Sequence, residues 1–503
     1  MPVRVARGLW QIPGLWQIPG PWHVIVCLLV SGCSLVPEYH RPDIETPVAW
    51  ATRAPGTGAA ALVPAQGAWW HSFGSTEIDD LMTQSLRWNN NLQAAIARIE
   101  QARATAEVLA APLYPAIGIT GTESNQSGVR TTRTHQVLGQ ASYELDFWGK
   151  NRAAAGSARA LAVASAFDAD TVAMTLAGTV LDTYFQVLSL AERIRLARQI
   201  ASDGRHVLSL IEIQQSAGTA TQLQVEQQRA VVGSFDAAVP ALQQQSDVAI
   251  HALAVLTGQP PEDLALKASD LSGFARPDVA TDLPSALLQR RPDVRAAEAR
   301  LQSANFDIGV ARAAFFPSLS LNAAVGIGAR KLFYPPAAVT DVGASLLQPL
   351  FQGGQLQGQL RFDRARQVEL VASYRQAVLT AFQDVEDQLS TLSHLRDQEA
   401  IVATAEVAAQ KAAGLAEMRY RLGSADYLSV LTTEQTLYQA QDTLLQLRLL
   451  RLQTIVGLFR ALGGGFDSPA GLTGAFTQVA AETGVLPPKF AAPSGGRSGS
   501  AGH

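Results

Sequence analysis

The side chains that could do chemistry are few and scattered. Asp384, Glu386 and Asp387 form a close group of carboxylates that could suggest an acid–base or cation site. At helical spacing, however, acidic residues more commonly form the solvated face of a helix. The eight histidines are spread along the chain, and none has the HExxH spacing of a zinc protease. We therefore predict a protein that is not an enzyme and that has no metal site.

The glycine, cysteine and charge content argue against a phosphate-binding loop, a disulfide-rich fold and a nucleic-acid-binding protein. The glycines at 463–465 follow a predicted helix instead of opening one, so they end the helix and do not cradle a phosphate. The two cysteines, Cys27 and Cys33, both lie near the N-terminus, which leaves no disulfide framework. With 39 basic and 43 acidic residues, the chain has no electrostatic signal for binding nucleic acid.

The N-terminus has the pattern of an export signal over residues 1–32. Arg4 and Arg7 precede an apolar stretch at 22–30, and small residues lead to Cys33. This ending resembles a bacterial lipobox, whose cysteine becomes the lipidated first residue of the mature chain; the alternative is an ordinary cysteine beside a cleavage site. We expect a covalent palmitate-containing lipid on Cys33, no other cofactor, and, because Ser34 follows, anchoring in the outer membrane. Residues 33–70, rich in proline, are predicted to be extended.

Two long helical hairpins follow from composition. Residues 350–468 lack proline and are rich in helix formers, with one interruption at Gly423, where the chain is predicted to fold back. The first helix of this hairpin would be about 100 Å long at ~1.5 Å per residue. Its charged residues exclude a membrane span, so it must pack sideways on similar helices in water. A second hairpin is predicted to turn near Gly218.

Four segments have the alternation of β-strands. In residues 134–147, apolar and polar side chains alternate, which predicts a strand with one apolar face. Residues 113–124 form a weaker partner, and residues 315–328 and 338–350 form a second pair.

These elements occur twice in the same order. Pro115, Gly218 and Gly258 have counterparts at Pro317, Gly423 and Gly463, at a near-constant offset of about 205 residues. We therefore divide the chain into repeat 1 at 71–265 and repeat 2 at 266–468, each a helix, two strands and a helical hairpin. The tail at 469–503 is predicted to be largely disordered.

Four strands of this length suit a tilted outer-membrane barrel, but the smallest such barrels need eight. An open sheet would leave unpaired edges in hydrocarbon, so the barrel must close between chains. Three chains give twelve strands, whereas two give a filled eight-stranded barrel. The predicted fold class is mainly α with transmembrane β, and the helices extend the barrel as a tube. The alternative is a soluble hairpin packed on a core.

Four motifs carry a family resemblance: residues 288–301 (LQRRPDVRAAEARL), 314–319 (AFFPSL), 347–354 (LQPLFQGG) and 33–39 (CSLVPEY). They resemble the outer-membrane factor family, the TolC-like channels, in its lipoprotein OprM/NodT branch. The resemblance implies a homotrimer in the Gram-negative outer membrane, with a twelve-stranded β-barrel, a long periplasmic α-helical barrel and a small mixed domain at its waist. It also implies the passive exit duct of a tripartite efflux pump for small molecules, with a periplasmic adaptor protein and an RND-type inner-membrane transporter as partners.

The resemblance also assigns roles to the hairpin turns, where this family docks on its adaptor. The matching residues are Ala217, Gly218, Thr219, Leu422, Gly423 and Ser424. The alternative is that these glycines are only helix caps.

Residues 427–435 match the segment that lines the closed periplasmic entrance in relatives, where acidic residues often follow two apolar ones. This chain has Ser429 and Thr432 there instead, which leaves Asp426 and Glu434 as the nearest carboxylates and Gln435 as a further candidate. Three copies of a carboxylate near the axis would attract cations; the alternative is that both acids lie on solvated helix faces.

Two other functions remain open on the sequence. A type I protein-secretion duct would use the same tube with other partners. A non-conducting structural periplasmic lipoprotein would use the long helices without a pore, and a conductance measurement separates it from a channel.

Overall fold

The computed structural model of the 503-residue chain describes residues 34–52, 67–126, 132–281, 283–329, 335 and 337–464. The predicted signal segment, Cys33 and the tail at 469–503 lie outside these residues. The described chain is mainly helical with one four-stranded sheet, as predicted. It divides into two compact units, and the first comprises residues 1–39, 106–157 and 304–366.

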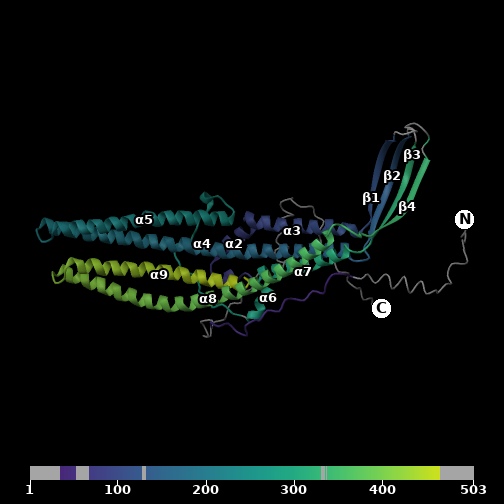
Figure 1. Cartoon of the computed structure of the whole chain (residues 1–503). Helices are drawn as coiled ribbons and strands as arrows, with labels where there is room; N and C mark the ends of the chain where they lie inside the picture. Colours follow the sequence, from purple (N-terminus) through teal and green to yellow (C-terminus); the bar gives the residue numbers. More distant parts are fainter. Residues whose placement is uncertain are drawn as a thin grey trace, which may run out of the picture. The chain divides into compact units, whose positions relative to one another are not determined.

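The elements follow the predicted order of helix, two strands and helical hairpin, twice (Figure 1). In the first half they are α2 (Thr76–Trp88), α3 (Asn90–Ala110), β1 (Ala116–Gln126), β2 (Thr132–Leu145), α4 (Lys150–Ser216) and α5 (Gln222–Thr257). In the second half they are α6 (Leu287–Arg290), α7 (Pro292–Ala313), β3 (Ser318–Ala329), β4 (Ala337–Leu347), α8 (Gln355–Arg421) and α9 (Tyr427–Ala461). Short 3-10 turns lie at Trp69–Phe73, Ala111–Leu113, Pro261–Asp263 and Pro284–Ala286.

The sheet of the first unit is antiparallel throughout, in the order β1-β2-β3-β4, so β2 and β3 join the two halves of the chain. The register places apolar residues opposite one another across all four strands. One such row runs from Ile117 through Ala141 and Ala323 to Val342, and the next runs from Ile119 through Gly139 to Val325 and ends at Thr340 of β4. Because residues directly opposite share a face, one side of the sheet has an apolar band across its strands, and polar residues such as Glu123 and His135 lie on the same side beyond this band.

The strand ends differ from the predicted ones because neighbouring polar groups have other partners. Strand β2 ends at Leu145, since the Asp146 carboxylate instead accepts hydrogen bonds from the backbone N–H groups of Asn151 and Arg152 at the start of α4. Strand β3 begins at Ser318, because Phe315 and Phe316 close the last turn of α7. Strand β1 begins at Ala116, after the 3-10 turn, and β4 ends at Leu347, before Pro349, which has no N–H to pair.

The second unit comprises residues 40–105, 158–303 and 367–503 and holds the helical core. Trp69 and Trp70, which we expected in the extended segment, are buried, and Trp69 stacks on Phe459 of α9 with 4.7 Å between ring centroids. Trp69 and Trp70 begin a 3-10 helix instead of continuing the extended segment, because burying their large side chains makes them part of the core. Tyr184 of α4 is fully buried and donates a 2.6 Å hydrogen bond to the Glu77 carboxylate of α2.

The carboxylates first considered for chemistry have structural partners. Asp384 pairs at 2.7 Å with Arg291, whose side chain is only 7% exposed and also pairs with Asp293. Glu386 accepts hydrogen bonds from the backbone N–H groups of Ala51 and Thr52. Asp387 accepts a 3.3 Å hydrogen bond from the side-chain amide of Gln383 on the same helix. The contacts of Asp384 and Glu386 hold the start of α7 and the N-terminal segment on α8.

One described helix, α4, is long and apolar enough to cross a membrane by length and composition. Half of its most apolar 18-residue window is buried in the chain's own core. Together with the predicted packing of helix on helix, this burial indicates a core helix.

Candidate functional site

The turn of the first hairpin is closed by its own backbone. Gly218 has the left-handed φ of 78°, and its N–H bonds the carbonyl of Gln215. The backbone N–H and hydroxyl of Thr219 both donate to the carbonyl of Gln214, at 2.9 and 3.0 Å. Thr221 then caps α5 in a capping box with Gln224. Ala217, Gly218 and Thr219 are exposed, and a side chain at position 218 would meet no atom within 4 Å.

The turn of the second hairpin has the same geometry. Gly423 has φ 69° and bonds the carbonyl of Tyr420, while the N–H and hydroxyl of Ser424 donate to the carbonyl of Arg419. Leu422 is 76% exposed, and the space around Gly423 is open. The glycines are therefore helix caps, and the exposed surface around them leaves room for a partner.

The two hairpins contact each other close to their turns, once before the turns and once after them. The Tyr420 hydroxyl of α8 donates a 2.7 Å hydrogen bond to Gln214 Oε1 of α4. The Tyr427 hydroxyl of α9 donates to Gln228 Oε1 of α5, and the Tyr427 ring packs with Ile211 and Val225 in a small apolar cluster. We call this contact between the hairpins the seam. Figure 1 shows both hairpins, α4–α5 in teal and α8–α9 in yellow-green, with their turns at the same end.

Sequence reasoning missed these seam residues. Tyr420 and Tyr427 lie on either side of the turn at Gly423, and Gln214 and Gln228 lie on either side of the turn at Gly218. The available signal was the presence of polar and tyrosine side chains within about three turns of each predicted hairpin end.

Four of the candidate entrance residues share the solvent-exposed side of α9. Asp426 is the N-cap of the helix and accepts hydrogen bonds from the Ser429 N–H and hydroxyl, at 2.9 and 2.5 Å. These bonds hold the pKa of Asp426 below its usual range, so it stays ionised. Thr432 and Gln435 continue the exposed side with uncharged polar groups.

Glu434 is separated from these four residues. It lies half-buried on the side of α9 that faces the seam, and burial raises its pKa to about 7, with the negative charges of Glu417 and Asp203 adding to the effect. Of the two predicted carboxylates, Asp426 is therefore the one on the exposed face.

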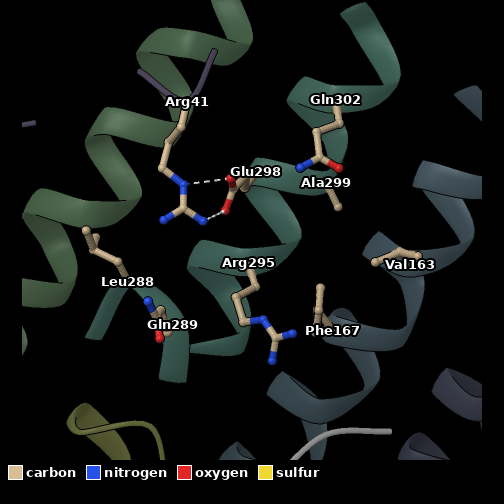
Figure 2. A pocket seen from close by; sticks show the side chains of 9 residues that line it. All are labelled: Arg41, Val163, Phe167, Leu288, Gln289, Arg295, Glu298, Ala299 and Gln302. Atoms are coloured by element: carbon tan, nitrogen blue, oxygen red, sulfur yellow. Dashed lines mark hydrogen bonds and ion pairs between the residues drawn. The ribbon is translucent and has the colours of Figure 1, made fainter. Parts of the chain in front are cut away.

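A cavity of about 510 Å³ lies in the second unit between α4 and the region of α6 and α7 (Figure 2). Arg41 of the N-terminal segment pairs with both oxygens of Glu298 at its wall, at 2.7 and 2.6 Å, and Arg295 covers the Phe167 ring at 4.1 Å. The charged side chains thus have partners in the chain itself. Among the described residues, no group of His, Cys, Asp and Glu could hold a metal ion.

The proposed lipid site, Cys33, lies outside the described residues, but the segment after it is held firmly. Asn305 Nδ2 of α7 donates a 2.7 Å hydrogen bond to the Pro37 carbonyl. Val36 packs on Gly309, where a Cβ would come within 2.5 Å of its side chain. The segment therefore runs along α7, because Gly309 leaves space for Val36 and the Asn305 side chain bonds the Pro37 carbonyl.

Comparison with known proteins gives a consistent result. A family profile described as outer membrane efflux protein matches residues 81–259 and 283–464. The pyoverdine export outer membrane protein OpmQ of Pseudomonas aeruginosa is 39% identical over 462 residues, covering 88% of this chain and 96% of that protein. The toluene efflux pump outer membrane protein TtgC of Pseudomonas putida is 31% identical, covering 89% and 96%.

Solved structures agree with the fold. The outer-membrane channel OprN superposes with a TM-score of 0.80 at 29% identity, covering 86% of this chain and 99% of that one. The open state of the MtrE outer membrane channel of Neisseria gonorrhoeae gives a TM-score of 0.78 at 28% identity, with 86% and 99% covered.

Proposed function

Because the chain belongs to the outer membrane efflux protein family, we propose that three copies of it form the exit channel of a tripartite efflux pump. The protein is an outer-membrane efflux channel, and its relatives are channel proteins rather than enzymes. The trimer would carry small molecules passively across the periplasm and the outer membrane.

The observation that carries the proposal is the apolar face of the sheet. Ile117, Ile119 and Val342 on this face are 82%, 81% and 87% exposed in the single chain. An apolar surface of this extent on an antiparallel sheet is unfavourable in water and suits the hydrocarbon of a bilayer. The opposite face carries polar residues such as Gln136, Gln140 and Asn322, which suit a water-filled interior.

The edges of the sheet support a shared barrel. Among the described residues, the outer edges of β1 and β4 pair with no other strand. Unpaired backbone groups cost several kcal/mol each in hydrocarbon, so each edge needs a strand from another copy. Three copies would supply twelve strands, which is enough for an aqueous lumen, whereas two would give a filled barrel.

The long hairpins would continue the lumen through the periplasm. Helices α4 and α8 each have 67 residues, about 100 Å at ~1.5 Å per residue. The hairpin ends would meet an adaptor protein at the exposed turns around Gly218 and Gly423, with an RND-type transporter as the inner-membrane partner. Three copies of Asp426, ionised and exposed, would favour cations at the entrance.

The lipid anchor on Cys33 completes the proposal. The segment that follows Cys33 contacts α7 through Pro37 and Arg41, and these contacts support an anchor at this end of the chain. Replacing Cys33 with Ala should abolish incorporation of labelled palmitate, and unchanged labelling would refute the anchor.

The cargo to test first follows from the relatives. The pyoverdine export proteins of Pseudomonas aeruginosa and Pseudomonas putida are 39% and 38% identical, against 31% for the toluene pump protein and 29% for the cation efflux protein CusC of Escherichia coli. Export of pyoverdine is thus the first assay. A type I secretion transporter recovered instead of an RND pump by cross-linking and mass spectrometry would favour the protein-secretion alternative.

Disulfide cross-linking between strand edges tests the shared barrel. Cysteine at Gly118 of β1 would be combined with cysteine at each position from 339 to 343 of β4 in turn. Oxidation in membranes should give covalent dimers and trimers for at least one position. The matched control places the first cysteine at Gln140 of the interior strand β2, where no cross-linked trimer is expected. Absence of cross-links across the whole series would refute the proposed closure.

A further inference from the structure

A carboxylate interrupts the buried side of α9 in the seam. Tyr427 and Val430 on this side are buried, and Leu431 and Tyr438 are partly buried. Glu434 lies four residues before Tyr438, which puts both on one side of the helix. Glutamate is seldom placed among such residues unless a partner neutralises it.

Helices from both hairpins surround Glu434. Asp203 of α4 and Glu417 of α8 are the charged groups that act on it, and both are negative. Tyr438 packs edge-on against Phe235 of α5, with 5.6 Å between ring centroids. Glu434 therefore lies where α4, α5, α8 and α9 converge.

The basic residues of this region are engaged elsewhere or exposed. Arg421 pairs with Glu417 along α8, and Arg205 of α4 pairs with Asp236 of α5 at 3.0 Å. Arg229 of α5 pairs with Glu212 and Glu226. His206, Lys411 and Arg419 are exposed. Within the described part of the chain, no ion pair or hydrogen bond joins Glu434 to a basic group.

Ionisation of Glu434 therefore opposes the closed seam. Burial raises its pKa from 4.5 to about 7 in this packing, and solvent would restore the ordinary value if the hairpins separated. Below pH 4.5 the residue is protonated in both arrangements and has no effect on the equilibrium between packed and separated hairpins. As the pH rises from 4.5 to about 7, the packed arrangement loses stability relative to the separated one, and above that the loss is constant.

We propose that Glu434 makes the seam proton-sensitive: its protonated form holds the two hairpins together at their ends, and its ionised form loosens them. In a channel, the loosened ends would widen the periplasmic entrance at neutral and alkaline pH; this consequence rests on the proposed function.

Hydrogen exchange of the backbone amides at 427–438 in the purified full-length trimer tests the proposal without requiring conduction. After correction for the intrinsic pH dependence of exchange, the rate should rise roughly tenfold from pH 6 to pH 8, as expected for a group whose pKa moves between 4.5 and about 7. In Glu434→Gln, which keeps the shape and removes the titration, the rise should fall below about twofold.

Glu226→Gln is the matched control, because Glu226 is an exposed acid near the same hairpin ends whose partners among the described residues are Gln222 and Arg229 of its own helix. This variant should keep the full pH response. An unmodified protein with a pH-independent rate, or a Glu434→Gln variant with an unchanged response, would overturn the proposal even if the channel conducts. A trimer that never conducts but shows the Glu434-dependent response would refute the proposed function and leave the proton-sensitive seam standing.

Discussion

The Tyr420 hydroxyl donates a 2.7 Å hydrogen bond to Gln214 Oε1, and this bond joins α8 of the second hairpin to α4 of the first. Each residue lies about one turn before the glycine that closes its hairpin. Because one residue comes from each hairpin and both lie next to a turn, the bond joins the ends of the two hairpins directly.

Replacing Tyr420 with Phe removes this bond and keeps the ring. A hydrogen bond of this kind contributes about 1 kcal/mol, so the equilibrium between packed and separated hairpin ends should shift roughly fivefold toward separation. Single-channel recording should then show a higher open probability. Tyr438→Phe is the control, since among described residues its hydroxyl has no hydrogen-bond partner and its ring contact with Phe235 remains. Equal behaviour of the two variants would contradict a special role for Tyr420.

Replacing Gly423 with Trp should leave trimers intact and abolish efflux, because a large side chain would project into the open space where a partner is proposed to dock. Efflux would be measured as substrate accumulation in cells. Gly423→Ala is the control: it has the same strain at φ 69° without the bulk, at a cost of about 1 kcal/mol, and should keep efflux. Normal efflux in Gly423→Trp would rule out docking at this turn.

Replacing Arg291 with Met should lower stability by roughly 2–3 kcal/mol, because a buried guanidinium is lost and the carboxylates of Asp293 and Asp384 lose their partner. The apparent melting temperature of the trimer in detergent measures the effect. The matched exposed pair is Arg300 with Asp168, 41% and 48% exposed, where Arg300→Met should cost less than about 1 kcal/mol. Similar melting temperatures for both variants would refute the structural role of Arg291.

Replacing Gly309 with Ala should displace the N-terminal segment, since the added Cβ would come within 2.5 Å of the Val36 side chain and 3.0 Å of its Cα. Cleavage after Glu38 by a glutamate-specific protease should accelerate several-fold. Gly358→Ala on α8, where no atom lies within 4 Å of the new Cβ, should leave the cleavage rate unchanged. Equal rates in both variants would show that the segment does not depend on this contact.

The sequence predicted the element types well, because strand alternation and the absence of proline are local signals. It placed strand ends a few residues away from the observed ones, since Asp146 and Phe315 serve helix ends instead of continuing the strands. The aromatic residues Trp69 and Trp70 were likewise expected in the extended segment, although tertiary packing makes them core.

The contacts of the seam could not be predicted from local pattern. Tyr420 and Gln214 are 206 residues apart in sequence, and their pairing depends on how two hairpins align in space. For the same reason, the sequence could identify residues 427–435 as the entrance segment but could not show which of them lie on the exposed side of α9. The separation of Glu434 from Asp426, Ser429, Thr432 and Gln435 required knowledge of which side of the helix faces the seam.

Conductance of the purified full-length protein in a planar lipid bilayer tests the central claim most directly. If three copies share one barrel and one water-filled lumen, the protein should migrate as a trimer in mild detergent and produce stable, stepwise ion conductance. A monodisperse monomer in mild detergent that produces no conductance steps would contradict the account.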